Sequence, residues 1–302
     1  NAAKVLGMKR SHKLFLYISF VIIIYLALIF SIYTPADLSE LIFGPNEHEL
    51  GIISYKIQSI YQEGSTQIKV LLPKNIDVNK RYKVLYVLPV TAQWLDCWWI
   101  NGLRVLAKSG IADKYDLIFV SPMFSRAPWY ADHPANPKIR QESYIIKDVI
   151  PFVDANLKTI QAPEGRYLIG FSRSGFGALS LLLRNLDTFG GAAVWDGTLS
   201  FEMSDNRWES GLKEVFETEE NFRKYYIPDL IQQQSLKLKH MAPKIVLMGY
   251  CYPNTKRQAL EISQLLSDLG IAHVCDVKIR RKHIWSSGWM VPAVEYLFGK
   301  EM

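Results

Sequence analysis

The segment 166–177, Arg-Tyr-Leu-Ile-Gly-Phe-Ser-Arg-Ser-Gly-Phe-Gly, constrains the fold more than any other part of the chain. It begins as an apolar run that predicts a buried strand, and an Ala- and Leu-rich helix is predicted to follow over 175–186. Between them, Gly170, Ser172 and Ser174 form a small-x-Ser-x-small turn. So sharp a turn has room only for small residues two places before and after its central serine. The pattern predicts a strand-turn-helix unit with Ser172 at its apex.

A serine at this apex is placed for nucleophilic attack, because its hydroxyl stands clear of the sheet. Arg173 opens the predicted helix, so its backbone N–H faces the region where negative charge would develop during attack. A serine that merely caps the helix is the simpler alternative. The position of the turn between a buried strand and an Ala- and Leu-rich helix favours Ser172 as a nucleophile.

The rest of the chain alternates between strand and helix patterns. Two runs, 52–59 and 66–72, predict an antiparallel hairpin around a Glu-Gly-Ser turn. Further strands are predicted over 84–88, 117–120, 167–169, 192–195, 244–248 and 273–279. Helices are predicted over 103–112, 142–157, 175–186 and 255–269. Because continuous apolar strands suit a sheet covered on both faces, this order predicts an α/β fold. It has a mostly parallel sheet, an antiparallel N-terminal hairpin and helices on both faces.

One stretch departs from this alternation. Residues 205–240 carry helical patterns but no strand, and they lie between the sixth and seventh predicted strands. We therefore expect a helical insertion over one end of the sheet, as a candidate cap, within a single domain over 37–302.

The serine needs a base, and the chain has six histidines. In the chain order serine, acid, histidine, the histidine lies in a loop after the last strand. His283 fits this place, since it follows the predicted strand 273–279 closely. His133 lies in a loop after the fourth strand and is predicted to contact substrate. His283 is therefore the predicted base.

The acid is harder to place. In many folds with this chain order it follows the seventh strand, but here the segment 247–254 contains no carboxylate. Asp196 directly follows the sixth strand, at the same edge of the sheet. An acid there can still reach the histidine loop, so Asp196 is the predicted acid. Asn254 is the alternative partner for the imidazole.

The catalytic edge has further candidates. A second donor to the oxyanion is expected in the loop after the third strand, from Val90 or Thr91. All eight tryptophans map to loops or strand ends, most of them at this edge. Such clustering suits an aromatic cleft for sugar rings or aryl acyl groups, with Trp129, Trp195 and Trp285 contacting substrate. Packing between long loops explains the clustering equally well.

Cysteine content and charge exclude several classes of protein. Three cysteines are too few for a disulfide scaffold, and Cys97 with Cys251 is the best candidate pair. The sequence has neither paired CxxC nor HExxH spacing, so no metal is predicted, and the expected chemistry needs no cofactor. Four of the net +6 charges precede residue 14, which leaves no basic stripe for nucleic acid.

The N-terminal region carries an uncharged apolar run over 14–33, long enough to cross a bilayer as a helix. Lys9, Arg10 and Lys13 precede the run and the first acids follow it, which predicts a cytoplasmic N-terminus and an extracytoplasmic remainder. Residues 1–36 are therefore expected to form either a cleaved signal peptide or an uncleaved membrane anchor.

Together these segments resemble the esterase D-like branch of the α/β-hydrolases, which also includes feruloyl and acetylxylan esterases and mycolyltransferases. The resemblance rests on the turn around Ser172 and on His283-Ile-Trp285 with Gly288-Trp289. Softer matches are Leu88-Pro89-Val90, Trp129-Tyr-Ala-Asp-His-Pro134, Glu142-Ser-Tyr144, Asp148-Val-Ile-Pro151 and Trp195-Asp196. It implies an α/β-hydrolase fold and hydrolysis of a carboxylic ester through an acyl-enzyme.

The predicted substrate is a small-molecule or carbohydrate ester. Two alternatives remain at this stage. One is an acyltransferase that uses the same triad with an alcohol in place of water. The other is a membrane-tethered, hydrolase-like binding protein without activity, for which an incomplete triad would be the signature.

Overall fold

The computed structural model of the chain describes residues 45–93, 102–204 and 209–299. The chain divides into two units, Asn1–Pro45 and Asn46–Met302, and the elements below belong to the second. The predicted apolar helix over 14–33 lies outside the described residues. Among the helices that are described, none is both long enough and apolar enough to span a bilayer.

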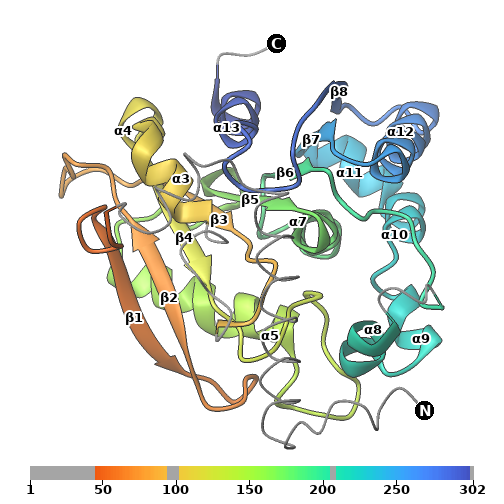
Figure 1. Cartoon of the computed structure of the whole chain (residues 1–302), viewed down its shortest axis with the longest axis horizontal. Coiled ribbons are helices and arrows are strands. Elements are labelled where there is room, and N and C mark those ends of the chain that lie inside the picture. Colours follow the sequence, from red (N-terminus) through yellow and green to blue (C-terminus); the bar gives the residue numbers. More distant parts are fainter. Residues whose placement is uncertain (1–44, 94–101, 205–208, 300–302) are drawn as a thin grey trace, which may run out of the picture. The chain divides into compact units, whose positions relative to one another are not determined.

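Eight strands form one sheet in the order β1-β2-β4-β3-β5-β6-β7-β8 (Figure 1). Their bounds are β1 Ile52–Gln58, β2 Ser65–Leu71, β3 Lys83–Val87, β4 Leu117–Pro122, β5 Arg166–Phe171, β6 Gly191–Trp195, β7 Lys244–Tyr250 and β8 Val274–Arg280. β1 and β2 form the predicted antiparallel hairpin, and β2 pairs antiparallel with β4. From β4 to β8 all pairs are parallel, so the predicted α/β fold class is confirmed.

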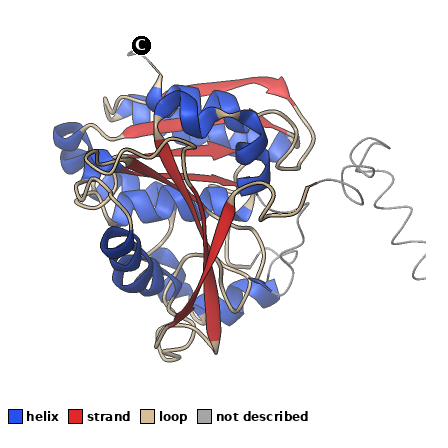
Figure 2. Ribbon diagram, turned by 90° about the vertical axis from the view of Figure 1, so that its left-hand side faces the viewer, coloured by secondary structure: helices blue, strands red, loops and turns tan. Residues whose placement is uncertain are grey.

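The sheet has a hydrophobic core on each face, because successive side chains of a strand point to opposite sides. Val84, Tyr86 and Leu88 belong to one core, and Leu85 and Val87 belong to the other. Figure 2 shows helices on both sides of the twisted sheet. The central strands are therefore buried on both faces, which explains their continuous apolar sequences.

The helices follow the predicted order with some breaks. They are α3 Gly102–Ser109, α4 Ile111–Tyr115, α5 Gln141–Tyr144, α6 Ile150–Asn156, α7 Arg173–Arg184, α8 Glu209–Phe216, α9 Glu219–Arg223, α10 Ile227–Gln233, α11 Ser235–Met241, α12 Pro253–Asp268 and α13 Met290–Phe298. The core shared with α7 and α12 is the larger one, and α3, α4 and α13 cover the opposite face. No prediction covers α13.

Two predicted helices are interrupted. The segment 103–112 divides into α3 and α4 because Gly110 takes a φ of 67°, a conformation open to glycine at little cost. The segment 142–157 contains a π-helical turn at Ile145–Val149 between α5 and α6. Pro151, which has no N–H, lies in the first turn of α6 directly after this π-helical turn, where the pattern of helical hydrogen bonds changes.

The insertion between β6 and β7 is helical, as predicted, and comprises α8 to α11. One ionic cluster ties it to the body of the domain. Both carboxylate oxygens of Glu142 accept hydrogen bonds from Arg184, and Asn185 donates a third at 2.8 Å. The Arg184 guanidinium also lies 4.1 Å from the ring centroid of Tyr225 in the insertion. Glu142 and Arg184 together therefore link α5, α7 and the insertion.

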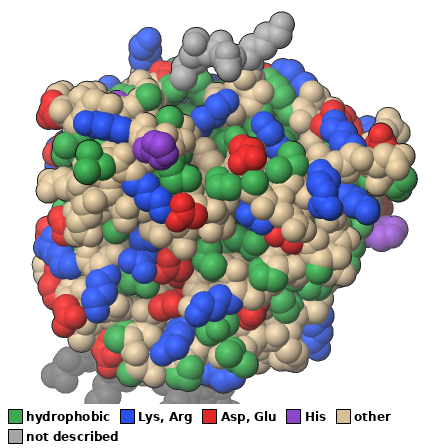
Figure 3. All heavy atoms as spheres, turned by 180° about the vertical axis from the view of Figure 1, so that it is seen from behind, with side chains coloured by type: hydrophobic (Ala, Val, Ile, Leu, Met, Phe, Trp, Pro, Cys, Tyr) green, Lys and Arg blue, Asp and Glu red, His purple; other side chains and the backbone are tan. Residues whose placement is uncertain are grey.

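The surface shows no single dominant charge on the face seen in Figure 3. Basic, acidic and hydrophobic side chains are interspersed there. On that face, the molecule lacks the continuous basic surface that a phosphate backbone would need.

Replacing Glu142 tests the ionic cluster. Glu142→Gln is expected to lower the free energy of unfolding by about 2 kcal/mol, because a largely buried guanidinium loses its charged partner. The matched control is Glu219→Gln, which breaks an exposed pair with Arg223 and should cost less than about 0.5 kcal/mol. Urea unfolding of both variants measures the difference, and equal losses would contradict the assignment.

Candidate active site

Ser172 occupies the predicted apex between β5 and α7. Its backbone takes φ 55° and ψ −128°, a conformation that non-glycine residues rarely adopt. Three backbone hydrogen bonds hold it there: its N–H donates to Trp195, and its carbonyl accepts from Gly175 and Thr198. The strained backbone is thus stabilised by the neighbouring strand end and by the start of the helix.

The small residues around Ser172 are required by contact. A Cβ placed on Gly170 would lie 2.1 Å from the carbonyl oxygen of Ser174, so no larger residue fits. The fully buried Ser174 hydroxyl accepts a hydrogen bond from the Phe171 N–H at 3.0 Å and donates one to the Phe171 carbonyl at 2.9 Å. Ser174 therefore does more than fit a small space, since its hydroxyl braces the end of β5.

Asp196 and His283 meet, as the sequence predicts. Asp196 directly follows β6 with a φ of 42°, and its Oδ2 is hydrogen-bonded to Nδ1 of His283. The Asp196 side chain is fully buried, whereas 27% of the His283 side chain is exposed. Because an ionised carboxylate only accepts, Nδ1 carries the proton, and Nε2 has its lone pair free for a second partner.

The other oxygen of Asp196 is also occupied. Oδ1 accepts from the Cys251 N–H at 2.8 Å and from the Thr255 hydroxyl. Burial alone would raise the pKa of Asp196, but hydrogen bonds from His283, Thr255 and Cys251 hold that pKa below its ordinary value. The carboxylate therefore stays ionised at neutral pH and keeps its hold on the imidazole.

Asn254, the alternative partner for the imidazole, bonds another residue. The Asn254 side-chain oxygen accepts a hydrogen bond from Arg257 at 2.8 Å, on the exposed surface of α12. Asn254 therefore does not orient the imidazole, and Asp196 occupies that position.

The residues next to Ser172 and Asp196 connect Ser172 to the His283–Asp196 pair. β5 and β6 are adjacent, and the Ser172 N–H bonds the carbonyl of Trp195, the residue before Asp196. The ring of Phe171 lies 4.9 Å from that of His283 between centroids. In the described part of the chain, no hydrogen bond joins the Ser172 hydroxyl to His283. Catalytic hydrogen bonds are often long before substrate binds, so this arrangement is compatible with a triad.

The predicted oxyanion donors lie at the same edge. Arg173 is the first residue of α7, so its backbone N–H lies at the start of that helix, directly after Ser172. The loop with Val90 and Thr91 follows β3, and β3 pairs with β5 beside Ser172. The hydroxyl of Tyr130 donates to the Pro89 carbonyl and holds the start of that loop. The roles of Arg173, Val90 and Thr91 as donors remain predictions.

The prediction that tryptophans line a substrate cleft is wrong for the described ones. Trp129, Trp195 and Trp285 are at most 2% exposed, so they are part of the core. Trp195 and Trp285 both stack on Trp289, and Trp129 packs against Phe176 and Phe201. Packing at strand ends therefore explains these residues. The tryptophans at 94, 98, 99 and 208 lie outside the described residues.

His133 also has a structural role. Its Nδ1 accepts hydrogen bonds from the backbone N–H groups of Ala135 and Asn136. An accepting Nδ1 carries no proton, so the Glu217 carboxylate 3.8 Å away makes no ion pair with that atom. His133 therefore closes a turn in its own loop, and the prediction that it contacts substrate is not supported by these contacts.

Three residues that contact the acid or the base are not predicted from sequence. Cys251 and Thr255 bond Asp196, and the ring of Tyr252 contacts His283. They follow β7, where a carboxylate was expected and none was found. Burial, and then the charge of Asp196, raises the pKa of the Cys251 thiol, which stays protonated. Cys251 and Cys275 are both free thiols, and Cys97 lies outside the described residues. The missing carboxylate was the only signal that this loop is unusual.

Comparison with known proteins places this arrangement in a family. Residues 59–241 match the model of the family described as "Putative esterase". The chain belongs to this esterase family. An esterase of Mycobacterium tuberculosis is 29% identical over 161 residues, 51% of this chain and 34% of that protein. The chain thus spans about a third of the length of this relative.

Solved structures confirm the α/β-hydrolase fold. A ferulic acid esterase matches with a TM-score of 0.63 at 18% identity, covering 82% of this chain and 95% of that one. A fluorophosphonate-binding serine hydrolase of Staphylococcus aureus matches with a TM-score of 0.63 at 16% identity, covering 82% and 98%. At these identities the likeness establishes the fold.

The lowered pKa of Asp196 predicts a pH dependence of stability. Its contribution is present in full above about pH 5, and is lost as the pH falls below about 4 through the folded-state pKa. Asp196→Asn should therefore be less stable than the native chain by about 2 kcal/mol at pH 7, and this difference should shrink below about pH 4. Urea unfolding across this range measures it.

The matched control is Asp187→Asn, since this carboxylate pairs with Lys237 on the surface and is 76% exposed. Its unfolding should follow the native pH dependence. If Asp196→Asn keeps the same stability deficit at pH 3.5 as at pH 7, within error, the lowered pKa is contradicted.

Proposed function

We propose that this chain is a serine esterase that hydrolyses a carboxylic ester through an acyl-enzyme. The observation that carries the proposal is the hydrogen bond from His283 to the buried Asp196, at the sheet edge where Ser172 stands on a strained turn. Membership of the esterase family supports it. Ser172 is the proposed nucleophile, His283 the base and Asp196 the acid of the triad.

In the first half of the reaction, Nε2 of His283 takes the proton from the Ser172 hydroxyl as the oxygen attacks the ester carbonyl. The carbonyl oxygen becomes an oxyanion, which the N–H of Arg173 and one from Val90 or Thr91 would hold. When the tetrahedral intermediate collapses, the C–O bond to the alcohol breaks and His283 gives the alcohol its proton. The acyl group remains on Ser172.

Water completes the reaction. His283, neutral again, takes a proton from water, which attacks the acyl carbonyl and forms a second oxyanion at the same place. Its collapse releases the carboxylic acid, and Ser172 regains its proton from His283. Throughout, Asp196 keeps the Nδ1 proton in place and stabilises the imidazolium, without itself being protonated.

The alternatives have lost their support. The non-catalytic alternative rested on an uncertain acid, and the hydrogen bond between His283 and Asp196 supports a complete triad instead. Acyl transfer would use the same residues, and no observation on the described chain favours an alcohol over water. For an aryl acyl group, the remaining support is the fold shared with a ferulic acid esterase, since the buried tryptophans provide none.

Labelling and hydrolysis test the triad. Purified protein should react with a fluorophosphonate probe and hydrolyse p-nitrophenyl acetate, and Ser172→Ala should abolish both. Asp196→Asn should lower kcat by about 10³- to 10⁴-fold, because the imidazole loses its orienting partner. Asn254→Ala, which removes the alternative partner predicted for the imidazole, should stay within about twofold of the native kcat. Labelling that survives Ser172→Ala would refute the assignment.

We also propose that residues 1–36 direct the domain out of the cytoplasm, as a cleaved leader or as a membrane anchor. The support is the apolar run 14–33 with basic residues before it and acids after it. In bacteria expressing residues 1–302, the domain should appear in the periplasmic fraction if the leader is cleaved, or be digested by protease added to spheroplasts if it stays anchored. Deletion of 1–36 should leave the domain inside the spheroplasts and resistant to protease. Recovery of the intact chain as a soluble cytoplasmic protein would contradict this proposal.

A further inference from the structure

Two aromatic rings contact the imidazole of His283. The ring of Phe171 lies 4.9 Å from it between centroids, and the ring of Tyr252 lies 5.2 Å from it, both tilted. The two rings differ in burial, because Phe171 is 4% exposed and Tyr252 is 52% exposed. The base thus contacts both a core side chain and a large aromatic side chain at the surface.

Three residues that contact the base lie at the ends of neighbouring strands of the sheet. Phe171 ends β5, Asp196 follows β6 and Tyr252 follows β7, and these strands are neighbours in that order. The hydrogen bond that Nδ1 of His283 donates to Asp196 fixes one atom of the imidazole, yet a ring held at one atom can still turn about that bond. Contacts with two further rings would limit this rotation, and with it the direction of Nε2.

The backbone of Tyr252 is itself held firmly. It lies directly before Pro253, which restricts it to the extended conformation seen, φ −106° and ψ 143°. Its carbonyl is 2.8 Å from the Thr255 hydroxyl, which also reaches Asp196 and gives its single proton to one of them at a time. The Cys251 N–H donates to the same carboxylate. One short loop therefore holds both the acid and Tyr252.

We propose that Tyr252 is a positioning residue, whose ring holds the imidazole of His283 in the plane needed for proton transfer. This inference rests on the proposed esterase function. Tyr252 acts through His283 and need not touch the substrate. It takes the place, in the loop after β7, where a carboxylate would otherwise be expected to hold the histidine.

Loss of the ring should reduce turnover without weakening substrate binding. With p-nitrophenyl acetate, Tyr252→Ala is expected to lower kcat about three- to tenfold, because the imidazole loses one aromatic contact. KM should stay within about twofold, since a small acyl group gains nothing from the ring. Tyr252→Phe keeps the ring and should restore kcat to within about twofold of the native value.

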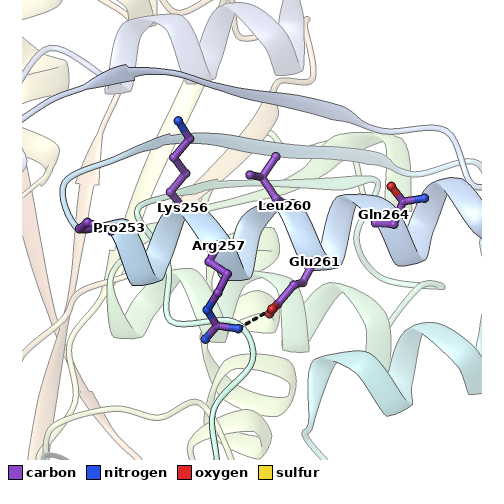
Figure 4. A pocket seen from close by; sticks show the side chains of 6 residues that line it. All are labelled: Pro253, Lys256, Arg257, Leu260, Glu261 and Gln264. Carbon is purple, nitrogen blue, oxygen red and sulfur yellow. Dashed lines mark hydrogen bonds and ion pairs between the residues drawn. The ribbon is translucent and has the colours of Figure 1, made fainter.

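A matched control comes from α12, the helix that begins directly after Tyr252. Leu260 is 47% exposed and borders a shallow cavity on the outer face of α12 with Lys256 and Gln264 (Figure 4). Leu260→Ala removes a comparable exposed apolar side chain away from His283 and should leave kcat and KM at native values. Thermal unfolding of each variant checks that it is folded. If Tyr252→Ala does not fold, Tyr252→Leu replaces it, and the same loss of kcat is expected.

Two results would overturn the inference: a native kcat in the folded alanine or leucine variant, or a rise in KM with kcat unchanged, which would make the ring a substrate contact. The proposed function fails separately, if the native protein neither reacts with the fluorophosphonate probe nor hydrolyses the ester. Native activity combined with an unaffected Tyr252→Ala therefore refutes only the role of Tyr252.

Discussion

The buried carboxylate of Asp196 is the interaction on which the catalytic edge depends. It accepts hydrogen bonds from His283 in the loop after β8, from the Cys251 N–H after β7 and from Thr255 in α12. A carboxylate taken out of water is costly unless its oxygens are satisfied, and here all its described partners are donors. One side chain at the end of a central strand thus fixes three separate segments, and the base takes its place from this arrangement.

The same edge holds two strained residues side by side. Ser172 and Asp196 both have positive φ, at 55° and 42°, and each such residue costs on the order of 1–3 kcal/mol. A backbone hydrogen bond links them through Trp195, and Ser174 braces the strand end before Ser172. The buried rings of Trp195 and Trp285 stack on Trp289 in the core at this edge. The buried aromatic layer therefore supports the strained turns instead of opening a cleft for substrate.

Much of this could be predicted from the sequence, and the reason is the local character of the signals. The tight turn is predicted by the small size of Gly170, Ser172 and Ser174 alone. The base, His283, is predicted by its place after the last strand. Asp196 could be predicted because no other carboxylate ends a neighbouring strand. The direction of a side chain at a strand end is a different matter, since it depends on tertiary packing. Trp195 and Trp285 lie where predicted along the chain, yet their rings point into the core.

The loop after β7 contributes to the site without supplying the acid. Because Asp196 at the end of β6 bonds the base, this loop need not supply a carboxylate. It still borders the base, and it contributes a backbone N–H to Asp196, a hydroxyl from Thr255 and the ring of Tyr252 beside His283. A hydrogen bond orients the imidazole at Nδ1, while tilted rings contact it elsewhere, so the two kinds of contact constrain different motions of the same side chain. An acid on β6 and an aromatic ring after β7 are therefore complementary, because neither alone fixes both the position and the plane of the base.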